Sequence, residues 1–574
     1  MKGPQTPFAQ YLHAEKYRAP GESFHEAMNR IAGALTDDRE EFLQFREILE
    51  DMRFMPGGRI QSAVGAPKQV TPYNCFVSGT IADSFIDGEG SIMDRATEAA
   101  ATMRLGGGIG YDFSTLRPRG APIKKLGSKS SGPMEFMGIF DAICKCIASS
   151  GHRRGAQMGV LRVDHPDIEE FIHAKQNDDR LNGFNISIGI TDDFMRAVKY
   201  GGSFDLKFNG EVYSTINASA LWEKIMRSTW DWAEPGVLFI DRINAMNNLW
   251  YCENIVATNP CGEQPLPPFG ACLLGSFNLV RYLVWTGDND HAPGEGGWQF
   301  NWEQFHKDIP QVVASMDRVI DIATYPLQAQ EQEAKNKRRM GLGITGLANA
   351  GETLGLPYGS MEFLKFEEKV LTMLRDESYR ASTMLAKTRG PFPLYEGNKY
   401  LHGEFIVTLP DDVLELINEH GMRNSHLTSI APTGTISLCA DNVSSGIEPV
   451  FSKSLIRTVQ TFDGPREENI KDYAFDKFGT VPKDSADVQA KDHLLVLAAA
   501  SRLVDSAVSK TCNVPSDMPW SDFKDLYMAA WEMGCKGLTT FNAGGKRMGI
   551  LKNETEEEGS SCKLDTTTGR MQCD

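Results

Sequence analysis

The ten residues Asn259-Pro260-Cys261-Gly262-Glu263-Gln264-Pro265-Leu266-Pro267-Pro268 are the most informative stretch of this chain for its fold. Proline and glycine take five of these ten positions. Neither a helix nor a central strand tolerates that content, so the stretch predicts a loop held stiff by its prolines. An amide, a thiol and a carboxylate stand at alternate positions, 259, 261 and 263. In a locally extended loop, alternate side chains point the same way.

Such a loop would bring Asn259, Cys261 and Glu263 to one point in space. A carboxylate can transfer a proton, an amide can orient a bound group, and a thiol can take part in bond chemistry. The pattern therefore favours a catalytic constellation. The alternative is a structural turn that contains a cysteine by chance, and the spacing alone does not decide between the two.

Outward from this loop, helix and strand patterns alternate up to about residue 450, which is typical of a wound α/β fold. Helical spacing predicts a mostly helical lead-in over residues 1–50. Further along, the patterns predict a strand over 73–77, a helix over 92–105 that stops at a triple glycine, a helix over 133–149 and a strand over 159–163.

Composition excludes some classes of function. The chain has 574 residues and a net charge of −17, which argues against a surface that binds DNA directly. A small anionic ligand remains possible, because it needs only a local pocket of N–H groups and one or two cations. We find no apolar run near the ~20 residues of a membrane span and no signal-peptide core at the N-terminus. A cytoplasmic protein is therefore expected.

The eleven cysteines include no CxxC pair, so a zinc ribbon is not expected and no metal ligands are assigned. In a reducing compartment they should be thiols, and each is a small buried apolar residue unless its context argues otherwise. Two of them, Cys562 and Cys573, fall in the Glu-, Ser- and Thr-rich stretch 551–574. That composition predicts a flexible tail.

The loop at 259–268 closely resembles the finger loop of ribonucleotide reductases, in the form found in the adenosylcobalamin-dependent, class II, members. Other motifs follow in the family's order along most of the chain. They are FMPGGR at 54–59, GGGIGYD at 106–112, GAQMGVLRVDHPDI at 155–168, RRMGLG at 338–343, APTGTIS at 431–437, SGIEPV at 445–450 and GCKGLT at 534–539.

This resemblance implies a ten-stranded α/β barrel over residues 51–550, with the finger loop at its centre and effector-binding insertions. A helical segment would precede it at 1–50, and a redox tail would follow at 551–574. The implied activity is reduction of ribonucleotides to 2′-deoxyribonucleotides for DNA synthesis. Diphosphates are the expected substrates and a homodimer the expected assembly, from similarity to the larger, dimeric branch of the family.

The family's roles carry over residue by residue. Cys261 would become a thiyl radical and abstract hydrogen from the ribose 3′ carbon, Glu263 would take the 3′ hydroxyl proton, and Asn259 would hydrogen-bond the sugar. Cys75 and Cys272 would supply the electrons and become a disulfide. Their Cα atoms must then come within about 7 Å, so their segments should be neighbouring strands. The alternative is two buried core cysteines.

The resemblance also implies that tail thiols reset this disulfide by exchange, and that a thioredoxin- or glutaredoxin-like reductant restores them. Cys562 and Cys573 are the candidates. They stand eleven positions apart, whereas the tail cysteines of relatives are often closely spaced. The alternative that one or both are incidental therefore stays open.

Two further sites follow from the resemblance. One is a turn that resembles the substrate phosphate site of the family and consists of Ala431, Pro432, Thr433, Gly434, Thr435 and Ile436. A small turn that enters a helix can offer N–H and Oγ groups to phosphate. The loop at 151–157 resembles the specificity loop that links a dNTP or ATP effector to the substrate base, and the segment 127–132 with the following helix resembles the rest of the effector site. The candidate residues are Asp141 on that helix and Arg153, Arg154, Gly155 and Gln157 in the loop. The alternative for that loop is an ordinary basic surface loop.

The radical source is inferred by exclusion within the family. Class I relatives receive the radical through a tyrosine pair near the C-terminus, and the segment 538–545 has none. The glycyl-radical segment of class III is not visible, although Gly544 and Gly545 stand in this region. Adenosylcobalamin remains. The rival hypotheses are a class I large subunit that needs a separate radical-generating subunit, and a nucleotide-binding regulator without catalysis.

Overall fold

The structure is a computed structural model. It describes residues 2–67, 70–124, 126–149, 153–154, 156–176, 180–287, 297–461, 464–542, 544–546, 552–553, 562–565 and 570–573. The predicted helical lead-in is confirmed as α1 (Pro7–Tyr17), α2 (Phe24–Ala34) and α3 (Arg39–Glu50). Ser23 and Glu26 form a capping box that satisfies the first N–H groups of α2. These helices pack into the largest core cluster rather than standing apart.

An eight-stranded sheet forms the centre of the molecule. In spatial order its strands are β15 (Ala271–Cys272), β2 (Cys75–Val77), β3 (Gly108–Asp112), β8 (Gln157–Arg162), β9 (Phe184–Ile190), β12 (Gly236–Phe239), β23 (Gly537–Asn542) and β22 (Thr511–Val514). The five strands from β2 to β12 run parallel. Antiparallel pairs bound this set on both sides, β15 with β2 and β12 with β23.

A second sheet has three strands, β1 (Phe54–Pro56), β16 (Leu274–Asn278) and β19 (Gly341–Thr345). Isolated bridges continue from its edge, joining Leu342 to Thr428 and Ile430 to Val508, both parallel. The mixed α/β class predicted from the sequence is confirmed. Among the described residues, the strands of these two sheets do not join into one closed ring of ten.

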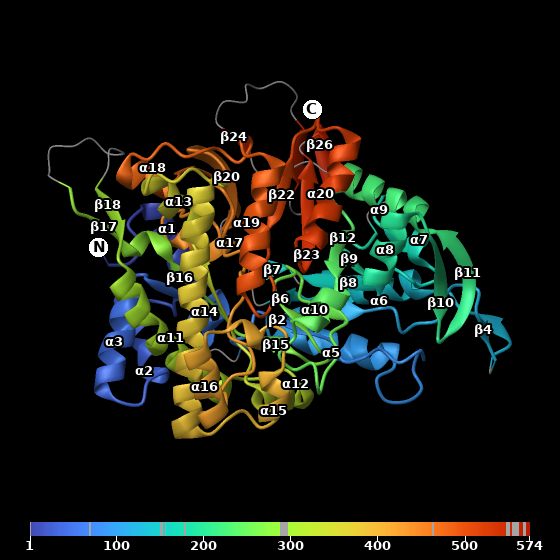
Figure 1. Cartoon of the computed structure of the whole chain (residues 1–574), viewed down its shortest axis with the longest axis horizontal. Coiled ribbons are helices and arrows are strands. Elements are labelled where there is room, and N and C mark those ends of the chain that lie inside the picture. The colour runs from blue at the N-terminus through green and yellow to red at the C-terminus, as the bar shows by residue number, and fades with distance from the viewer. Residues whose placement is uncertain are drawn as a thin grey trace.

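Helices cover the outer faces of the sheets (Figure 1). The longer ones are α5 (Ile92–Arg104), α6 (Pro133–Cys146), α8 (Asp192–Tyr200), α9 (Ala218–Trp232), α11 (Trp302–Ile322), α12 (Gln328–Lys337), α14 (Met361–Arg389), α16 (Asp411–His420), α19 (Ala490–Leu503) and α20 (Trp520–Glu532). The shorter ones are α4 (Gly58–Ala63), α7 (Ile168–Ile172), α10 (Ile240–Ala245), α13 (Leu347–Thr353), α15 (Gly397–Leu401), α17 (Gly434–Cys439) and α18 (Tyr473–Phe478). Inside the described ranges, no helix is both long enough and apolar enough to span a bilayer.

Paired short strands complete the fold. They are β4 (Pro122–Ile123) with β5 (Ser128–Lys129), β6 (Ala148–Ser149) with β7 (Arg153–Arg154), β10 (Ser203–Phe208) with β11 (Glu211–Asn217), β13 (Ala257–Thr258) with β14 (Pro265–Leu266), β17 (Leu283–Trp285) with β18 (Trp298–Phe300), β20 (Ser454–Thr461) with β21 (Gly464–Lys471) and β24 (Lys552–Asn553), and β25 (Cys562–Asp565) with β26 (Arg570–Cys573). The prediction of one helix over 133–149 was too long: α6 ends at Cys146, because Ala148–Ser149 turns extended and pairs with β7.

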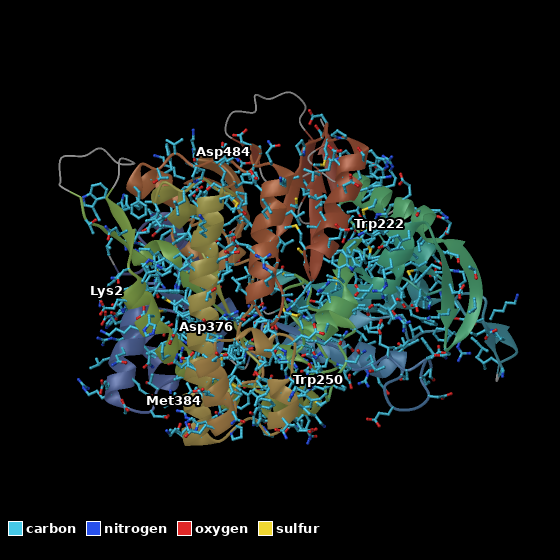
Figure 2. All side chains as sticks on the ribbon, in the orientation of Figure 1. Lys2, Trp222, Trp250, Asp376, Met384 and Asp484 are labelled. Atoms are coloured by element: carbon cyan, nitrogen blue, oxygen red, sulfur yellow. The ribbon has the colours of Figure 1, made fainter. Side chains whose placement is uncertain are left out.

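Three apolar clusters hold these layers together, and side chains fill the space between them (Figure 2). Met384 on α14, labelled in that view, is 46% exposed, whereas Tyr379 on the same helix is 0% exposed. The long helix thus buries one face and presents the other to solvent. The smallest cluster combines side chains from β2, β8, β12, β14, β15 and β16 with Ala431. It surrounds the loop at 259–268.

Candidate active site

The loop at 259–268 is a tight hairpin rather than an extended segment. β13 and β14 pair antiparallel on its two sides, and the Asn259 N–H donates to Gln264 O at 3.1 Å. The Gly262 N–H donates to Asn259 O at 3.1 Å, and Gly262 has a φ of +82°. The predicted loop is therefore present, but it does not have the extended form in which alternate side chains would point the same way. A left-handed glycine closes a turn at its tip, which alternation of side chains cannot reveal.

The hairpin lies between the two sheets. On one side β13 contacts β3 and β8, and a Cβ atom at Gly110 would stand 1.9 Å from Thr258 O. On the other side the Glu263 carbonyl accepts hydrogen bonds from Ser429 Oγ (2.9 Å) and the Ala507 N–H (3.0 Å). The five parallel strands anchor this loop on one side, and the chain that follows β19 anchors it on the other. A finger loop at the centre of a barrel would be held from both sides in this way.

The three predicted groups differ in exposure. Asn259 and Glu263 are buried, at 0% and 1%, while Cys261 is partly exposed. The Asn259 Oδ1 atom accepts from the Gln264 N–H (2.9 Å) and from Thr258 Oγ1 (3.2 Å). Its Nδ2 group has no hydrogen-bond partner among the residues that the structure describes. A buried donor of this kind costs stability unless a ligand satisfies it, so the Asn259 amide is ready to bind a polar ligand group.

The two predicted redox cysteines lie opposite each other. β15 pairs antiparallel with β2, and the register sets Cys272 against Cys75. The prediction that these segments are neighbouring strands is confirmed. Both residues are buried and carry thiols. Burial raises the pKa of the Cys272 thiol well above its usual value, and the nearby Glu263 and Cys75 raise it further. The effect of Glu263 on the pKa of Cys272 indicates that the two thiols and the finger loop belong to one site.

The predicted phosphate turn connects to the same place through Ser429 and Ala431. Thr433 adopts a left-handed conformation (φ +53°) immediately before α17. Its Oγ1 lies 2.9 Å from Thr345 Oγ1 and accepts the Gly446 N–H at 2.8 Å. Pro432 is partly exposed, Gly434 and Thr435 are exposed, and Ile436 is buried. The turn is thus braced from behind, with an open face at the start of the helix.

A family model for the ribonucleotide reductase barrel domain matches residues 73–541 of this chain. The chain belongs to the ribonucleotide reductase family. The family predicted from the finger loop is thereby confirmed. The matched range contains the finger loop, Cys75 and Cys272, and the predicted phosphate turn at 431–436.

Similar proteins cover most of this ribonucleotide reductase chain. A vitamin B12-dependent ribonucleoside-diphosphate reductase of Thermoplasma acidophilum is 32% identical over 569 residues, covering 93% of this chain and 69% of the relative. The protein of the same name from Mycobacterium tuberculosis is 32% identical, covering 94% and 79%. A ribonucleoside-diphosphate reductase subunit alpha of Chlamydia muridarum is 27% identical, covering 67% and 41%.

The predicted effector residues of this reductase that the structure describes lie on α6, β7 and β8. Asp141 Oδ1 accepts the Gly183 N–H (2.8 Å), and its Oδ2 pairs with Lys145 (2.7 Å). Gln157 is buried, accepts from Tyr111 and donates its N–H to Gly183 O (3.2 Å). The Gly183 peptide therefore links the two. Arg153 and Arg154 form β7, and Gly155 lies outside the described residues.

The two tail cysteines of the reductase fall on the last pair of strands. β25 and β26 are antiparallel, and the register sets Cys562 opposite Cys573. Their spacing of eleven in the sequence therefore does not separate them, because a hairpin brings the two ends of the segment together.

Other residues of the site gave no sequence signal. Asn185 on β9 donates to the Pro260 carbonyl at 2.8 Å, Ser429 holds the Glu263 carbonyl, and Gly110 leaves room for β13. Single polar or glycine residues inside strands are common, so only the tertiary contact distinguishes these three. The family motif GGGIGYD at 106–112 did contain Gly110, but its resemblance did not indicate what the glycine touches.

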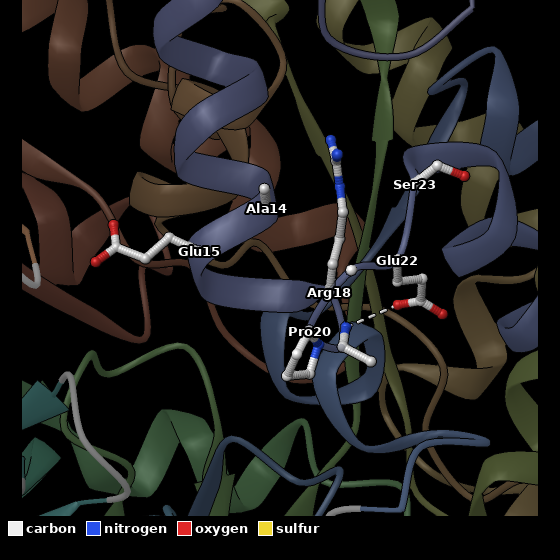
Figure 3. A pocket seen from close by; sticks show the side chains of 8 residues that line it. Ala14, Glu15, Arg18, Pro20, Glu22 and Ser23 are labelled. Carbon is white, nitrogen blue, oxygen red and sulfur yellow. Dashed lines mark hydrogen bonds between the residues drawn. The ribbon is translucent and has the colours of Figure 1, made fainter.

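A surface hollow of about 530 Å³ lies between α1 and α2 (Figure 3). Its lining residues are Ala14, Glu15, Arg18, Ala19, Pro20, Gly21, Glu22 and Ser23. In it the Ala19 N–H donates to Glu22 Oε2 at 2.8 Å. None of these residues belongs to the site of the finger loop.

Proposed function

We propose that this chain reduces ribonucleoside diphosphates to 2′-deoxyribonucleoside diphosphates, with a cobalamin as the source of the initiating radical. The observation that carries the proposal is the opposition of Cys75 and Cys272 on adjacent strands, beside a finger loop that carries a third thiol. The names of the Thermoplasma and Mycobacterium relatives, both vitamin B12-dependent ribonucleoside-diphosphate reductases, support the substrate and the cofactor.

The chain's own groups divide the reaction between them. Cys261, at the partly exposed tip, takes hydrogen from the ribose 3′ carbon. Glu263 accepts the 3′ hydroxyl proton, and the unsatisfied Asn259 Nδ2 group donates a hydrogen bond to the sugar. The 2′ hydroxyl then leaves the substrate as water. Cys75 and Cys272 supply two electrons and become a disulfide, which their facing positions on paired strands support.

The exposure of the finger loop fits an external radical source. Cys261 and Gly262 are partly exposed while Asn259, Glu263 and Gln264 are buried, so the thiol is the part of the loop that a large cofactor can approach. Adenosylcobalamin, when bound, supplies the organic radical that starts the reaction. No group of side chains among the described residues can be assigned to hold it.

For the fold we propose a ten-stranded barrel made of two five-stranded parallel halves. One half is β2, β3, β8, β9 and β12. The other half has five members in this order: β16, β19, the segment around Thr428, the segment that runs from Val508 into β22, and β23. Antiparallel pairs at β15–β2 and β12–β23 supply both seams between the halves. The barrel would fill residues 51–550, between a helical segment at 1–50 and a redox tail at 551–574.

The remaining assignments are part of the same proposal. The turn at 431–436 binds the substrate phosphates, and a dNTP or ATP effector binds near Asp141, Arg153, Arg154, Gly155 and Gln157. The facing positions of Cys562 and Cys573 on β25 and β26 support a dithiol tail that resets the active-site disulfide. A thioredoxin- or glutaredoxin-like protein reduces that tail, and the assembly is a homodimer.

Turnover by the purified chain tests this proposal. Adenosylcobalamin, a dithiol and CDP should yield dCDP with no second protein, which separates this reading from a class I large subunit that needs a partner. Cys261→Ser should abolish product, whereas the matched variant Cys146→Ser, at an exposed cysteine on α6, should retain it. Substantial dCDP from Cys261→Ser would rule out Cys261 as the thiyl residue. Nucleotide binding without any reduction by the parent chain would favour a non-catalytic regulator.

A further inference from the structure

Glu263, the proposed proton acceptor, is held through its main-chain carbonyl by donors from two separate segments. The Ser429 hydroxyl donates to this carbonyl at 2.9 Å, and the Ala507 N–H donates to it at 3.0 Å. Ser429 lies between α16 and α17, whereas Ala507 lies between α19 and β22. The two segments are far apart in the sequence, so the place of the Glu263 carbonyl depends on what holds the segments together.

The Asp505 side chain joins these two segments. Its carboxylate accepts the Leu427 N–H at 2.7 Å and the Thr428 N–H at 3.0 Å. In return, Thr428 Oγ1 accepts the Asp505 N–H at 2.9 Å, and the Thr428 carbonyl accepts the Ser506 N–H at 3.1 Å. These hydrogen bonds fix residues 427–428 against residues 505–506. The next residue of each segment is the one that reaches the finger loop.

The Asp505 carboxylate is itself held from a third side. Asp505 is 3% exposed, and its Oδ2 atom also accepts the Tyr379 hydroxyl of α14 at 2.8 Å. Lys536, immediately before β23, donates its Nζ group to the carbonyls of Val504, Asp505 and Ser506. Burial raises the pKa of the Asp505 carboxyl, whereas its hydrogen-bond donors and the positive charge of Lys536 act to lower it. The donors therefore partly compensate the cost of burying this carboxylate.

A fixed carbonyl restricts the direction of the Glu263 side chain. The carbonyl belongs to the planar peptide group that joins Glu263 to Gln264. The Gln264 N–H, on the opposite edge of the same plane, donates to Asn259 Oδ1 at 2.9 Å. Because both edges of the plane are held, the Cα–Cβ bond of Glu263 can turn little. The Glu263 carboxylate thus starts from a fixed base, as proton transfer over a short distance requires.

We propose that Asp505 is a positioning residue for the reductase reaction. It fixes Ser429 and Ala507, and these two hold the peptide plane from which Glu263 reaches the substrate. This inference rests on the proposed function, because it takes Glu263 as the group that accepts the 3′ hydroxyl proton. Asp505 acts only through these contacts, so its loss slows the step that uses Glu263 and leaves the affinity for substrate nearly unchanged.

Asp505→Asn tests this role with almost no change in volume. A carboxylate can accept the N–H groups of residues 427 and 428 together, whereas an amide has one acceptor and turns its own NH₂ group against the other N–H. We expect kcat for dCDP formation to fall by at least about tenfold, because a misplaced base reacts slowly. KM for CDP should change by less than about twofold. A parent-like kcat would overturn the proposal.

Asp308→Asn is the matched control. Asp308 on α11 is also 3% exposed and also accepts a tyrosine hydroxyl, that of Tyr282, at 2.9 Å. Its other partners are Arg53 and Gln304, outside the finger loop and the two segments that hold it. Both variants should lower the midpoint of chemical denaturation, but only Asp505→Asn should lower kcat per folded molecule. An equal loss of kcat in both variants would overturn the proposal.

Hydrogen exchange of the finger loop measures its positioning without any cofactor. The N–H groups of Asn259, Gly262 and Gln264 are bonded within the hairpin. We expect the peptide that covers residues 257–266 to exchange at least about threefold faster in Asp505→Asn than in the parent or in Asp308→Asn. Unchanged exchange would overturn the link from Asp505 to the finger loop. Faster exchange in a chain whose parent forms no dCDP would overturn the proposed function, and with it the catalytic part of this inference.

Ser429→Ala is a second, milder variant that removes one of the two donors to the Glu263 carbonyl. We expect it to lower kcat and to speed exchange of the finger loop. In the double variant with Asp505→Asn, the two effects on kcat should multiply to less than their product, because Asp505 acts through Ser429. A full product would overturn the proposal. If Asp505→Asn does not fold, a parent-like kcat together with parent-like exchange in Ser429→Ala would overturn it instead.

Discussion

Replacing Gly110 with alanine should displace the base of the finger loop. A Cβ atom at Gly110 would lie 1.9 Å from Thr258 O and 3.0 Å from Thr258 C. Carbon and oxygen atoms of this kind approach no closer than about 3.3 Å, so the main chain of β13 would have to move by about 1.4 Å. The new Cβ atom is fixed by the main chain of Gly110, and the atoms it meets belong to the main chain of Thr258. No side-chain rotation can therefore relieve the clash.

The displacement should cost both stability and rate. Thr258 directly precedes Asn259, so the shift reaches the catalytic residues through the chain. Misplacement by 1 Å can lower a rate by about a hundredfold, and overpacking a filled interior costs about 1–3 kcal/mol of unfolding free energy. We therefore expect kcat for dCDP formation to fall by about two orders of magnitude, with a lower midpoint of chemical denaturation.

A second glycine provides the matched control. Gly138 lies inside α6, and a Cβ atom there would meet nothing within 4 Å. Gly138→Ala should therefore keep the parent rate and gain up to about 1 kcal/mol of stability from helix propensity. Both variants are compared in the same turnover and denaturation assays. Parent-like kcat and parent-like stability for Gly110→Ala would refute the packing of the finger loop against β3.

Three further predictions follow from buried groups. Cys75→Ser or Cys272→Ser should block repeated turnover with a dithiol, because no disulfide can form, and normal steady-state rates for either would contradict the redox pair. The pKa of Glu352 is raised from 4.5 to about 7 by burial, so the folded state keeps a proton that the unfolded state loses. Unfolding free energy should fall as the pH rises from 4.5 to about 7, and Glu352→Gln should flatten this dependence in denaturation curves at pH 5 and pH 8; equal slopes for variant and parent would contradict it. Lys536 Nζ donates to the carbonyls of Val504 and Ser506 and, at 2.8 Å, of Asp505. Lys536→Met should destabilise the fold by about 3 kcal/mol, because buried carbonyls lose a charged donor, and an unchanged denaturation midpoint would refute that role.

Local features of the sequence predicted local features of the fold well. The triple glycine at 106–108 marked the end of α5, and proline at 133 began α6. The prediction failed where a turn depended on one backbone angle. Gly262 made the finger loop a hairpin, and the return of the chain at Ala148 shortened α6.

Part of the site could also be predicted. The identities of Asn259, Cys261 and Glu263, and the requirement that Cys75 and Cys272 be neighbours, came from motifs that carry chemistry. The contacts of Asn185 and Ser429 could not be predicted, because each reaches a main-chain carbonyl of the finger loop from a distant strand or segment. A hydrogen bond to backbone leaves no pattern in the sequence of its acceptor.

The sequence by itself determined the family, the alternation of helices and strands, and which residues carry reactive groups, because these depend on residue identity and short-range spacing. Only the tertiary structure decided that Cys272, Cys75 and Gly108 lie side by side across β15, β2 and β3. The physical reason is that register between strands far apart in the chain is set by packing and hydrogen bonding across the whole sheet. That register sets Cys75 opposite Cys272.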